Sequence, residues 1–325
     1  MIRRLCILIA IILGLALGPR QATTQAAPTN ASFALNWLTN VEFAGIWMAQ
    51  KQGWWSQAGL HVTARGYDFT NDPVLLIGAG KYTFGFQDGA SLIIARAKGI
   101  PLKAVWASAQ QSPFAFITMP NSHITTVKDF RGKRIGYQAH QLYVLQAMLN
   151  HEGMSLSDVK PVVVQFDPTV LLAGKVDAYL AFITNEPIAL ADKGVKVNII
   201  KASDYGYDFY SDVLFTTDNT IKTQPGLVRK VVQIINRGWQ YAIAHPAATA
   251  QYVVKTAKLD TQDTVAQQTA EMQALGRLSS GPDGARGAMQ PARWQHGINL
   301  LLKYKQITSS LPASAIFTSQ FLPAH

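Results

Sequence analysis

The sequence contains very little cysteine: its 325 residues include one, Cys6. Cys6 lies in an apolar segment near the N-terminus that is expected to be removed, and it comes too early to be a lipid-modified residue at the cleavage site. The mature chain is therefore predicted to have no disulfide, no thiol nucleophile and no thiolate metal ligand. Packing alone must hold it together, which a chain of this length allows.

Charged residues are also scarce, at 15% of the chain, whereas 48% is hydrophobic. This balance argues against disorder and for buried cores, and the length suggests about two domains. The formal net charge of +10 falls by three, to +7, when Arg3, Arg4 and Arg20 are removed with the first segment. The other basic side chains are scattered rather than interleaved with aromatic residues, so no nucleic-acid partner is expected.

Sequence signatures of catalysis are missing as well. The seven histidines are dispersed and none has metal-ligand spacing to another. The chain has no glycine-rich phosphate loop, no nucleophile elbow and no HExxH helix. We therefore predict no catalytic residue, no metal and no cofactor, and a protein that is not an enzyme.

Long apolar runs are confined to the first segment. A short basic start, residues 1–4, precedes an almost wholly apolar stretch at residues 5–17, which has the length of a signal-peptide core and is too short to span a bilayer comfortably. A polar stretch follows, and cleavage is predicted after Ala26; an uncleaved anchor is the alternative. Residues 1–26 are thus a predicted signal peptide, and the mature chain is expected in the periplasm or at the outer face of the cell membrane.

The chain does contain a repeated phrase. Residues 73–86 are PVLLIGAGKYTFGF and residues 168–182 are PTVLLAGKVDAYLAF. Each is a short apolar helix pattern that begins with Pro, ends with Gly-Lys and leads directly into a strand-like run. The repeat predicts two similarly built α/β lobes with a cleft between them, a favoured ligand site. Chance is the alternative, because glycine commonly follows helices.

Strand-like and helix-like patterns alternate along most of the chain, which is typical of parallel α/β sheets. We predict two α/β lobes joined by hinge crossings near residues 111–116 and 210–215, an arrangement that permits closure around a ligand. The expected boundaries are a linker at 27–32, lobe one at 33–113 plus 214–325, and lobe two at 114–213.

Ligands of open parallel sheets bind beyond the carboxyl ends of the strands. The corresponding loops, at 37–43, 67–70, 87–90, 138–143 and 183–187, are rich in aromatic and amide side chains. The candidate ring walls are Trp37, Phe43, Tyr67, Phe69 and Tyr143; the candidate hydrogen-bonding residues are Asn40, Gln87, Asp88, Gln138, Asn185 and Glu186; and the crossings add Gln111, Phe114 and Tyr210.

This set favours a flat, neutral, heteroaromatic ligand. Aromatic stacking contributes roughly 0.5–1.5 kcal/mol per pair beyond burial, and an unpaired polar group in a closed cleft costs about 1–3 kcal/mol. A sulfonate, phosphate or metal would require Arg, Lys or His clusters, which these loops lack. Structural roles remain the alternatives: half-buried core for Trp37, a turn or cap for Asn40, and helix starts for Asp88 and Glu186.

Residues 35–62, LNWLTNVEFAGIWMAQKQGWWSQAGLHV, resemble the opening of periplasmic binding proteins of the thiamin-pyrimidine type. Residues 75–105, 128–137 and 171–190 agree with that family in order and spacing, so the resemblance covers about residues 33–255. It implies a type II periplasmic-binding fold and delivery of a small-molecule ligand to the permease and ATPase of an ABC importer. The mature protein is expected to be a monomer.

The family includes carriers of formylated aminopyrimidines, carriers of riboflavin and a fungal pyrimidine synthase. The synthase resembles an enzyme with a cysteine-rich iron site and a pyridoxal-bearing lysine, which a chain without cysteine does not match. The pyrimidine carriers place Asn-His before the first helix, where this sequence has Glu42-Phe43. Loss of the His donor and gain of a Phe wall favour a larger flat ring, such as the isoalloxazine of riboflavin.

The function predicted from the sequence is therefore riboflavin capture for ABC import. The alternative ligand is a thiamin pyrimidine precursor, formylaminopyrimidine or hydroxymethylpyrimidine. Two other classes stay open: an enzyme related to the pyrimidine synthase, and a ligand-sensing domain of a membrane receptor.

Overall fold

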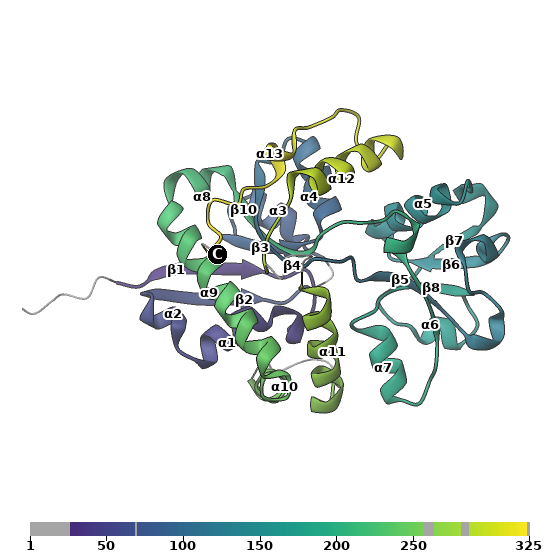
Figure 1. Ribbon diagram of the computed structural model, residues 1–325, viewed down its shortest axis with the longest axis horizontal. Coiled ribbons are helices and arrows are strands. Elements are labelled where there is room, and N and C mark those ends of the chain that lie inside the picture. The colour runs from purple at the N-terminus through teal and green to yellow at the C-terminus, as the bar shows by residue number, and fades with distance from the viewer. Residues whose placement is uncertain (1–26, 69, 257–262, 281–285, 324–325) are drawn as a thin grey trace, which may run out of the picture.

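The computed structural model describes residues 27–68, 70–256, 263–280 and 286–323. Within them the chain forms two five-stranded mixed sheets, with strand orders β2-β1-β3-β10-β4 and β7-β6-β8-β5-β9. Figure 1 shows each sheet in its own body with helices around it; we call the body built on the first sheet lobe one and the other lobe two. The predicted signal peptide lies outside the described residues, and none of the helices described has the length and apolarity needed to cross a membrane.

Lobe one is built on a sheet in which β1 runs parallel to β2 and β3, while β10 runs antiparallel to β3 and β4. The first strand begins within the predicted linker at 27–32, because Thr29 already pairs with Leu60 and the alternate residues Ala31 and Phe33 are buried. The strands are β1 (Thr29–Ala34), β2 (Leu60–Arg65), β3 (Phe84–Gln87), β4 (Leu102–Ala109) and β10 (Ser211–Thr217).

Lobe two repeats this plan. In its sheet β6 runs parallel to β7 and β8, and β5 runs antiparallel to β8 and β9. The strands are β5 (Phe114–Thr118), β6 (Arg134–Tyr137), β7 (Lys160–Val163), β8 (Ala178–Phe182) and β9 (Asn198–Lys201).

The two copies of the repeated phrase occupy equivalent positions. The first forms α3 (Pro73–Gly78) and leads into β3; the second forms α6 (Thr169–Leu172) and leads into β8. Both strands are third in their sheets, with a parallel neighbour on one side and an antiparallel neighbour on the other. Gly80 and Gly174 have φ angles of +70° and +65°, the left-handed conformation that glycine adopts without strain. The structure thus confirms the α/β fold with two similarly built halves.

Helices cover the sheets on both lobes (Figure 1). The long amphipathic helix α9 (Pro225–Ala244) buries one face against lobe one, including Trp239, whose ring lies 6.2 Å from that of Trp106 on β4. Besides α3 and α9, the helices of lobe one are α1 (Ala44–Lys51), α2 (Trp54–Gln57), α4 (Gly89–Ala97), α8 (Asp218–Thr223), α10 (Pro246–Thr256), α11 (Val265–Leu278), α12 (Pro291–Lys303) and α13 (Ala313–Ile316). Besides α6, those of lobe two are α5 (Leu142–His151) and α7 (Glu186–Asp192).

Helices α1 and α9 cross at two glycines. A Cβ atom added to Gly238 would lie 2.2 Å from the carbonyl oxygen of Gly45, and one added to Gly45 would lie 2.5 Å from the ring of Trp239. The backbones approach this closely because neither residue has a side chain. This contact fixes α1, and with it the loop of lobe one that precedes α1.

The chain passes between the sheets twice, at residues 110–113 and 202–210. The crossings predicted from the sequence were near residues 111–116 and 210–215. The differences arise because 114–118 and 211–217 are already strands, β5 and β10, paired on both sides. Residues that follow the carboxyl ends of β1, β2, β3, β6, β7 and β8 face the space between the lobes.

Candidate functional site

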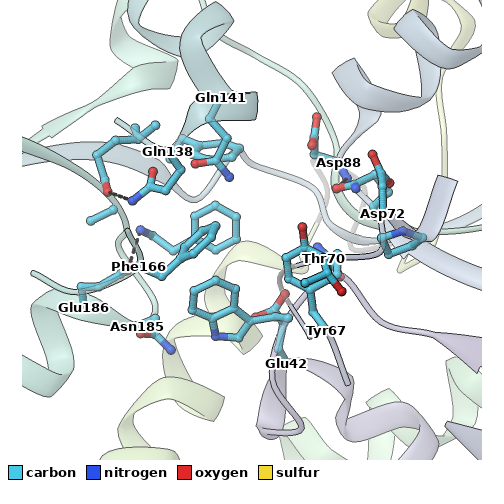
Figure 2. A pocket seen from close by; sticks show the side chains of 18 of the residues that line it. Glu42, Tyr67, Thr70, Asp72, Asp88, Gln138, Gln141, Phe166, Asn185 and Glu186 are labelled. Atoms are coloured by element: carbon cyan, nitrogen blue, oxygen red, sulfur yellow. Dashed lines mark hydrogen bonds between the residues drawn. The ribbon is translucent and has the colours of Figure 1, made fainter. Parts of the chain in front are cut away.

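A cleft lies between the lobes and is lined by both. Its cavity has a volume of about 250 Å³, or about 1050 Å³ when the open mouth is included. Figure 2 shows Gln138, Phe166, Asn185 and Glu186 on the side of lobe two, facing Tyr67 and Asp88 of lobe one. The position agrees with the general rule that ligands bind beyond the carboxyl ends of strands in such sheets.

The ends of the strands place the lining residues. Trp37 follows β1, Tyr67 follows β2 and Asp88 follows β3; in lobe two, Gln138 follows β6 and Asn185 follows β8. Eight residues singled out in the sequence are brought together here: Trp37, Tyr67, Gln87, Asp88, Phe114, Gln138, Asn185 and Glu186.

Aromatic rings from the two lobes meet across the cleft. The indole of Trp37 in lobe one and the ring of Phe166 in lobe two lie 4.7 Å apart, edge to face at 70°. Near the first crossing, Phe114 and Phe182 form a second edge-to-face pair at 4.5 Å. The cleft therefore has flat apolar surfaces on both sides and at its back, which suits a planar ligand.

Several polar atoms in the cleft are buried without a hydrogen-bond partner among the described residues. They include Asn36 Oδ1, Gln138 Oε1 and Glu42 Oε1. The amide of Gln138 is held in place, since its Nε2 donates to the carbonyl of Leu180 at 3.2 Å and to the hydroxyl of Tyr179 at 3.1 Å. The wall of the cleft therefore contains polar groups whose hydrogen-bonding capacity is not used within the described residues.

Carboxyl groups line the cleft from both lobes. Asp88 begins α4 by accepting the N–H of Ser91 at 3.0 Å, and it also accepts the hydroxyl of Tyr143 from lobe two at 3.1 Å. Glu186 begins α7 and accepts the N–H of Phe182 at 2.9 Å, and burial raises its pKa to about 7. The helix-start roles weighed for Asp88 and Glu186 are therefore both present, and both residues still line the cleft.

Glu42 is the most deeply placed of these acids, at 5% exposure. Burial, and next the carboxyl of Asp212, raise its pKa well above the usual range. Asp212 is 1% exposed, and burial raises its pKa to about 6. The pair lies at the lobe-one end of the cleft, where Glu42 is part of the lining and Asp212 lies behind it.

Cations are absent from the lining of the cleft as far as the structure describes it: no Lys, Arg or His is among its residues. Within the same described part of the chain, no group of three His, Cys, Asp or Glu side chains is arranged to hold a metal ion. The electrostatic character of the site is therefore acidic to neutral, and an anionic group placed in it would meet carboxylates without a compensating charge.

Phe43 does not form a wall of the cleft, which corrects the prediction made for it. It is fully buried in lobe one, with its ring 5.4 Å from that of Phe86. Asn40 accepts the N–H of Glu42 at 2.9 Å and thereby begins the short 3-10 turn η1 (Val41–Phe43). This turn directs Glu42 toward the cleft and Phe43 into the core, so Asn40 has the capping role that was its alternative.

Three other predicted residues also lie outside the lining. Tyr143 is buried behind Asp88 and reaches the site through its hydroxyl. Gln111 and Tyr210 line a different cavity beside the crossings, where the hydroxyl of Tyr210 accepts the N–H of Gln290 at 2.8 Å. The crossings turn these two side chains toward α12 rather than toward the cleft. Phe69 lies outside the described residues.

The sequence analysis missed more than half of the lining. Phe166 had the clearest signal, because residues 162–166, VVVQF, form a strand-like apolar run that ends at Phe166, and ligands bind at such strand ends. Leu180, Ala181 and Phe182 had no such signal. They lie in a strand, and which of its side chains face the cleft cannot be assigned without knowing the neighbouring strands. The lining residues not predicted are Asn36, Glu42, Thr70, Asp72, Pro73, Leu75, Gln141, Phe166, Leu180, Ala181 and Phe182.

Comparisons with known proteins agree with this architecture. A family model described as NMT1/THI5 like matches residues 40–249. The riboflavin-binding protein RibY of Chloroflexus aurantiacus is 31% identical over 260 residues, which cover 74% of this chain and 73% of RibY. The 4-amino-5-hydroxymethyl-2-methylpyrimidine phosphate synthase of Aspergillus parasiticus is 24% identical over 239 residues, 69% of each chain.

Among solved structures, the alkanesulfonate-binding protein SsuA from Xanthomonas axonopodis pv. citri, bound to MOPS, superposes with a TM-score of 0.68 at 16% identity, covering 90% of this chain and 100% of that one. The periplasmic aliphatic sulphonate binding protein SsuA from Escherichia coli gives 0.68 at 14% identity, over 92% and 95% of the two chains. At these identities the likeness establishes the fold, that of type II periplasmic binding proteins.

Proposed function

The chain belongs to the NMT1/THI5-like family, as a solute-binding protein with the type II periplasmic-binding fold, and we propose that it captures riboflavin outside the cytoplasm and presents it to the permease and ATPase of an ABC importer. The observation that carries this proposal is the pair of rings, Trp37 and Phe166, that meet from opposite lobes in a cleft without cations. Because the two rings already touch each other, a planar ligand would lie against the surfaces that they present to the cavity rather than between them.

Ligand charge is the second argument. Four carboxyl-bearing residues line the cleft, and the lining that the structure describes contains no basic side chain; the four are Glu42, Asp72, Asp88 and Glu186. An alkanesulfonate, the ligand class named for SsuA, would be repelled here. A neutral ring system with N–H and O–H donors, such as riboflavin with its imide and ribityl hydroxyls, would instead meet amide side chains along the lining, among them Gln87, Gln141 and Asn185.

A thiamin pyrimidine precursor is the second candidate, favoured by one specific observation. Aminopyrimidines present N–H donors and ring nitrogens on a small ring, and Glu42 and Glu186 offer carboxyl groups at the two sides of a cavity of about 250 Å³. The burial of Phe43 also removes the extra wall from which the sequence favoured a larger ring. Saturable binding of the pyrimidine without binding of riboflavin would distinguish this candidate.

A non-enzymatic role is part of the proposal. The synthase relatives are enzymes by name. The family resemblance described above implies that this enzyme branch carries a pyridoxal-bearing lysine. No lysine is among the described residues of the cleft, so the site offers no amine for such a linkage. Binding, closure of the lobes and release to a permease require no group that the cleft lacks.

The test is a titration of the purified mature chain with riboflavin, followed by flavin fluorescence and by calorimetry, beside the same titration with hydroxymethylpyrimidine. Stacking against Trp37 should quench the flavin, with saturable binding at one ligand per chain. Saturable binding of the pyrimidine alone would establish the second candidate. Absence of binding to both would refute the proposed function.

A further inference from the structure

Arg293, in the first turn of α12, contacts both crossings between the lobes. Its Nη1 donates to the carbonyl oxygen of Gln110, with which the first crossing begins after β4. Its Nη2 donates to the carboxylate of Asp208 and, at 3.2 Å, to the carbonyl oxygen of Phe209, both in the second crossing. The guanidinium carbon also lies 4.2 Å from the centre of the Tyr210 ring. One planar side chain thus holds three consecutive residues of one crossing and the start of the other.

Other contacts attach the same parts of the crossings to lobe one. The main-chain N–H of Gln110 donates to the carbonyl oxygen of Leu278, at the end of α11, at 2.8 Å. The ring of Phe209 packs so closely against α12 that a Cβ atom added to Gly297 would lie 2.6 Å from it. The end of each crossing that adjoins the sheet of lobe one is therefore fixed to lobe one.

The earlier part of the second crossing is attached to lobe two instead. It begins with the 3-10 turn η6 (Ala202–Tyr205), and the N–H of Tyr207 donates to the carbonyl oxygen of Ala202 at 3.1 Å. The ring of Tyr207 is stacked on that of Tyr143 in α5, with the ring centres 6.1 Å apart and the planes at 22°. The attachment therefore changes from lobe two to lobe one between Tyr207 and Asp208.

The fixed end of the second crossing also positions part of the cleft. The carbonyl oxygen of Tyr210 accepts the N–H of Gly89 at 2.9 Å. Gly89 directly follows Asp88, which lines the cleft and accepts the hydroxyl of Tyr143 from lobe two. Arg293 thus acts on the cleft through Tyr210 and Gly89, although it is not among the lining residues that the structure describes.

We propose that Arg293 is a positioning residue that fixes the pivot of lobe closure. Because it holds the lobe-one ends of both crossings, bending is confined to residues 111–113 in the first and to the junction of Tyr207 and Asp208 in the second. Bending at so few residues restricts the lobes to one path of closure and aligns the two walls of the cleft. The inference rests on the proposed function in that the closure it controls is closure around a ligand.

The first test uses small-angle X-ray scattering from the ligand-free protein. Arg293→Met, unbranched like arginine but without charge or donors, should show a broader range of lobe separations and a larger radius of gyration than the unaltered protein. The matched control is Arg96→Met, because Arg96 also donates to a carboxylate, that of Asp218, and to a main-chain carbonyl, that of Leu102, in the last turn of α4; it should leave the profile unchanged. Should Arg293→Met fail to fold, Asp208→Ala carries the same test, since that side chain is half-exposed.

The second test follows riboflavin binding by stopped-flow fluorescence. Arg293→Met should bind about three- to tenfold more weakly, because a smaller fraction of its molecules has the walls of the cleft aligned. The loss should come from faster dissociation. Arg293→Lys keeps the charge but not the planar fork, so its dissociation rate should lie between those of Arg293→Met and the unaltered protein. Arg96→Met should bind normally.

The two tests separate the possible failures. If the unaltered protein does not bind riboflavin but Arg293→Met broadens the range of lobe separations, the proposed ligand is wrong and the pivot is established; the kinetics are then repeated with hydroxymethylpyrimidine. Scattering and dissociation rates in Arg293→Met that match those of the unaltered protein would overturn the inference. Equal changes in Arg96→Met would also overturn it, because they would show a general loss of stability.

Discussion

The hydroxyl of Tyr143 in lobe two donates to the Oδ2 atom of Asp88 in lobe one, at 3.1 Å. Asp88 is held by its own lobe as well, because it accepts from the N–H and the hydroxyl of Ser91 at the start of α4. Burial, and next the charge of Asp88, raise the pKa of Tyr143 well above its usual range, so the phenol stays a donor. The contact is therefore a direct polar link between the lobes, immediately behind the cleft.

Removing this link should weaken the closed state. We expect Tyr143→Phe to bind riboflavin roughly three- to tenfold more weakly, since one hydrogen bond to a charged group contributes about 1.5–3 kcal/mol and Ser91 retains part of the bonding to Asp88. Stopped-flow fluorescence should show that the loss of affinity comes from faster dissociation of riboflavin. Tyr304→Phe, at the end of α12, is the control and should bind normally; equal affinity in both variants would show that the link does not stabilise closure.

The contact between Trp37 and Phe166 leads to a second prediction. Trp37→Ala should reduce riboflavin affinity at least tenfold and remove most of the flavin quenching, because stacking contributes roughly 0.5–1.5 kcal/mol beyond the buried area that is also lost. Trp54→Phe is the control, since Trp54 packs beneath Arg237 on lobe one and lies away from the cleft. Unchanged quenching in Trp37→Ala would mean that the ring binds elsewhere.

The acidic cleft predicts discrimination by ligand charge. Flavin mononucleotide should bind at least tenfold more weakly than riboflavin, because its phosphate adds negative charge near Asp72, Asp88 and Glu186 without a cation to meet it. Gln141→Lys, which places an ammonium group in the lining on the side of lobe two, should narrow that difference. Competition calorimetry at low and high salt measures both effects, and equal affinities for the two flavins would contradict the charge argument.

Buried acids predict how stability depends on pH. Burial raises the pKa of Glu271 to about 8 and that of Glu186 to about 7, and both carboxyls titrate near 4.5 when unfolded. Between these values the folded chain holds protons that the unfolded chain has lost, so the free energy of unfolding must fall as pH rises from about 4.5 to 8. The two shifts together correspond to a fall of up to about 8 kcal/mol.

Denaturant unfolding at pH 5.5 and pH 8.5 measures this fall. Glu271→Gln should reduce it, because a glutamine at this position does not titrate. Asp129 and Asp158, whose pKa values are lowered by backbone hydrogen bonds, act only below pH 4 and do not affect this window. A stability that rises between the two pH values would contradict the assignment of raised pKa values.

The crossing of α1 and α9 predicts a large effect from one methyl group. Gly238→Ala should lower the free energy of unfolding by about 1–3 kcal/mol or more, since its Cβ would overlap the carbonyl of Gly45. Gly226→Ala, in the same helix with open space around it, should be neutral or stabilise by about 0.5–1 kcal/mol. Equal melting temperatures in the two variants would show that the helices can separate at little cost.

Much of the architecture could be predicted from local patterns. The repeated phrase identified α3 with β3 and α6 with β8, because a proline start, an apolar turn and a left-handed glycine are all encoded within about fifteen residues. The strand-end loops could be found for the same reason, and Tyr67, Asp88, Gln138 and Asn185 lie in the cleft as a result. The sheet order, with the late strand β10 inserted between β3 and β4, had no such local signal.

The direction of individual side chains in the site could not be predicted in the same way. Glu42 and Phe43 are neighbours in the 3-10 turn η1, but the side chain of Glu42 lines the cleft and that of Phe43 is buried in the core. A shift of one position along the turn would change which side chain faces the ligand. Phe166 could be located at a strand end, but its partner Trp37 belongs to the other lobe, and only the approach of the lobes brings the rings together.

By itself the sequence determined the two-lobed α/β plan, the edge of the sheets at which a ligand is expected, and the neutral to acidic character of that edge, because hydrophobic period, glycine placement and residue type are local properties. Tertiary structure alone decided that Trp37 meets Phe166 and that Asp88 meets Tyr143. Each of these contacts joins segments far apart in the chain, and its geometry depends on how the two sheets and their crossings pack, which no local pattern specifies.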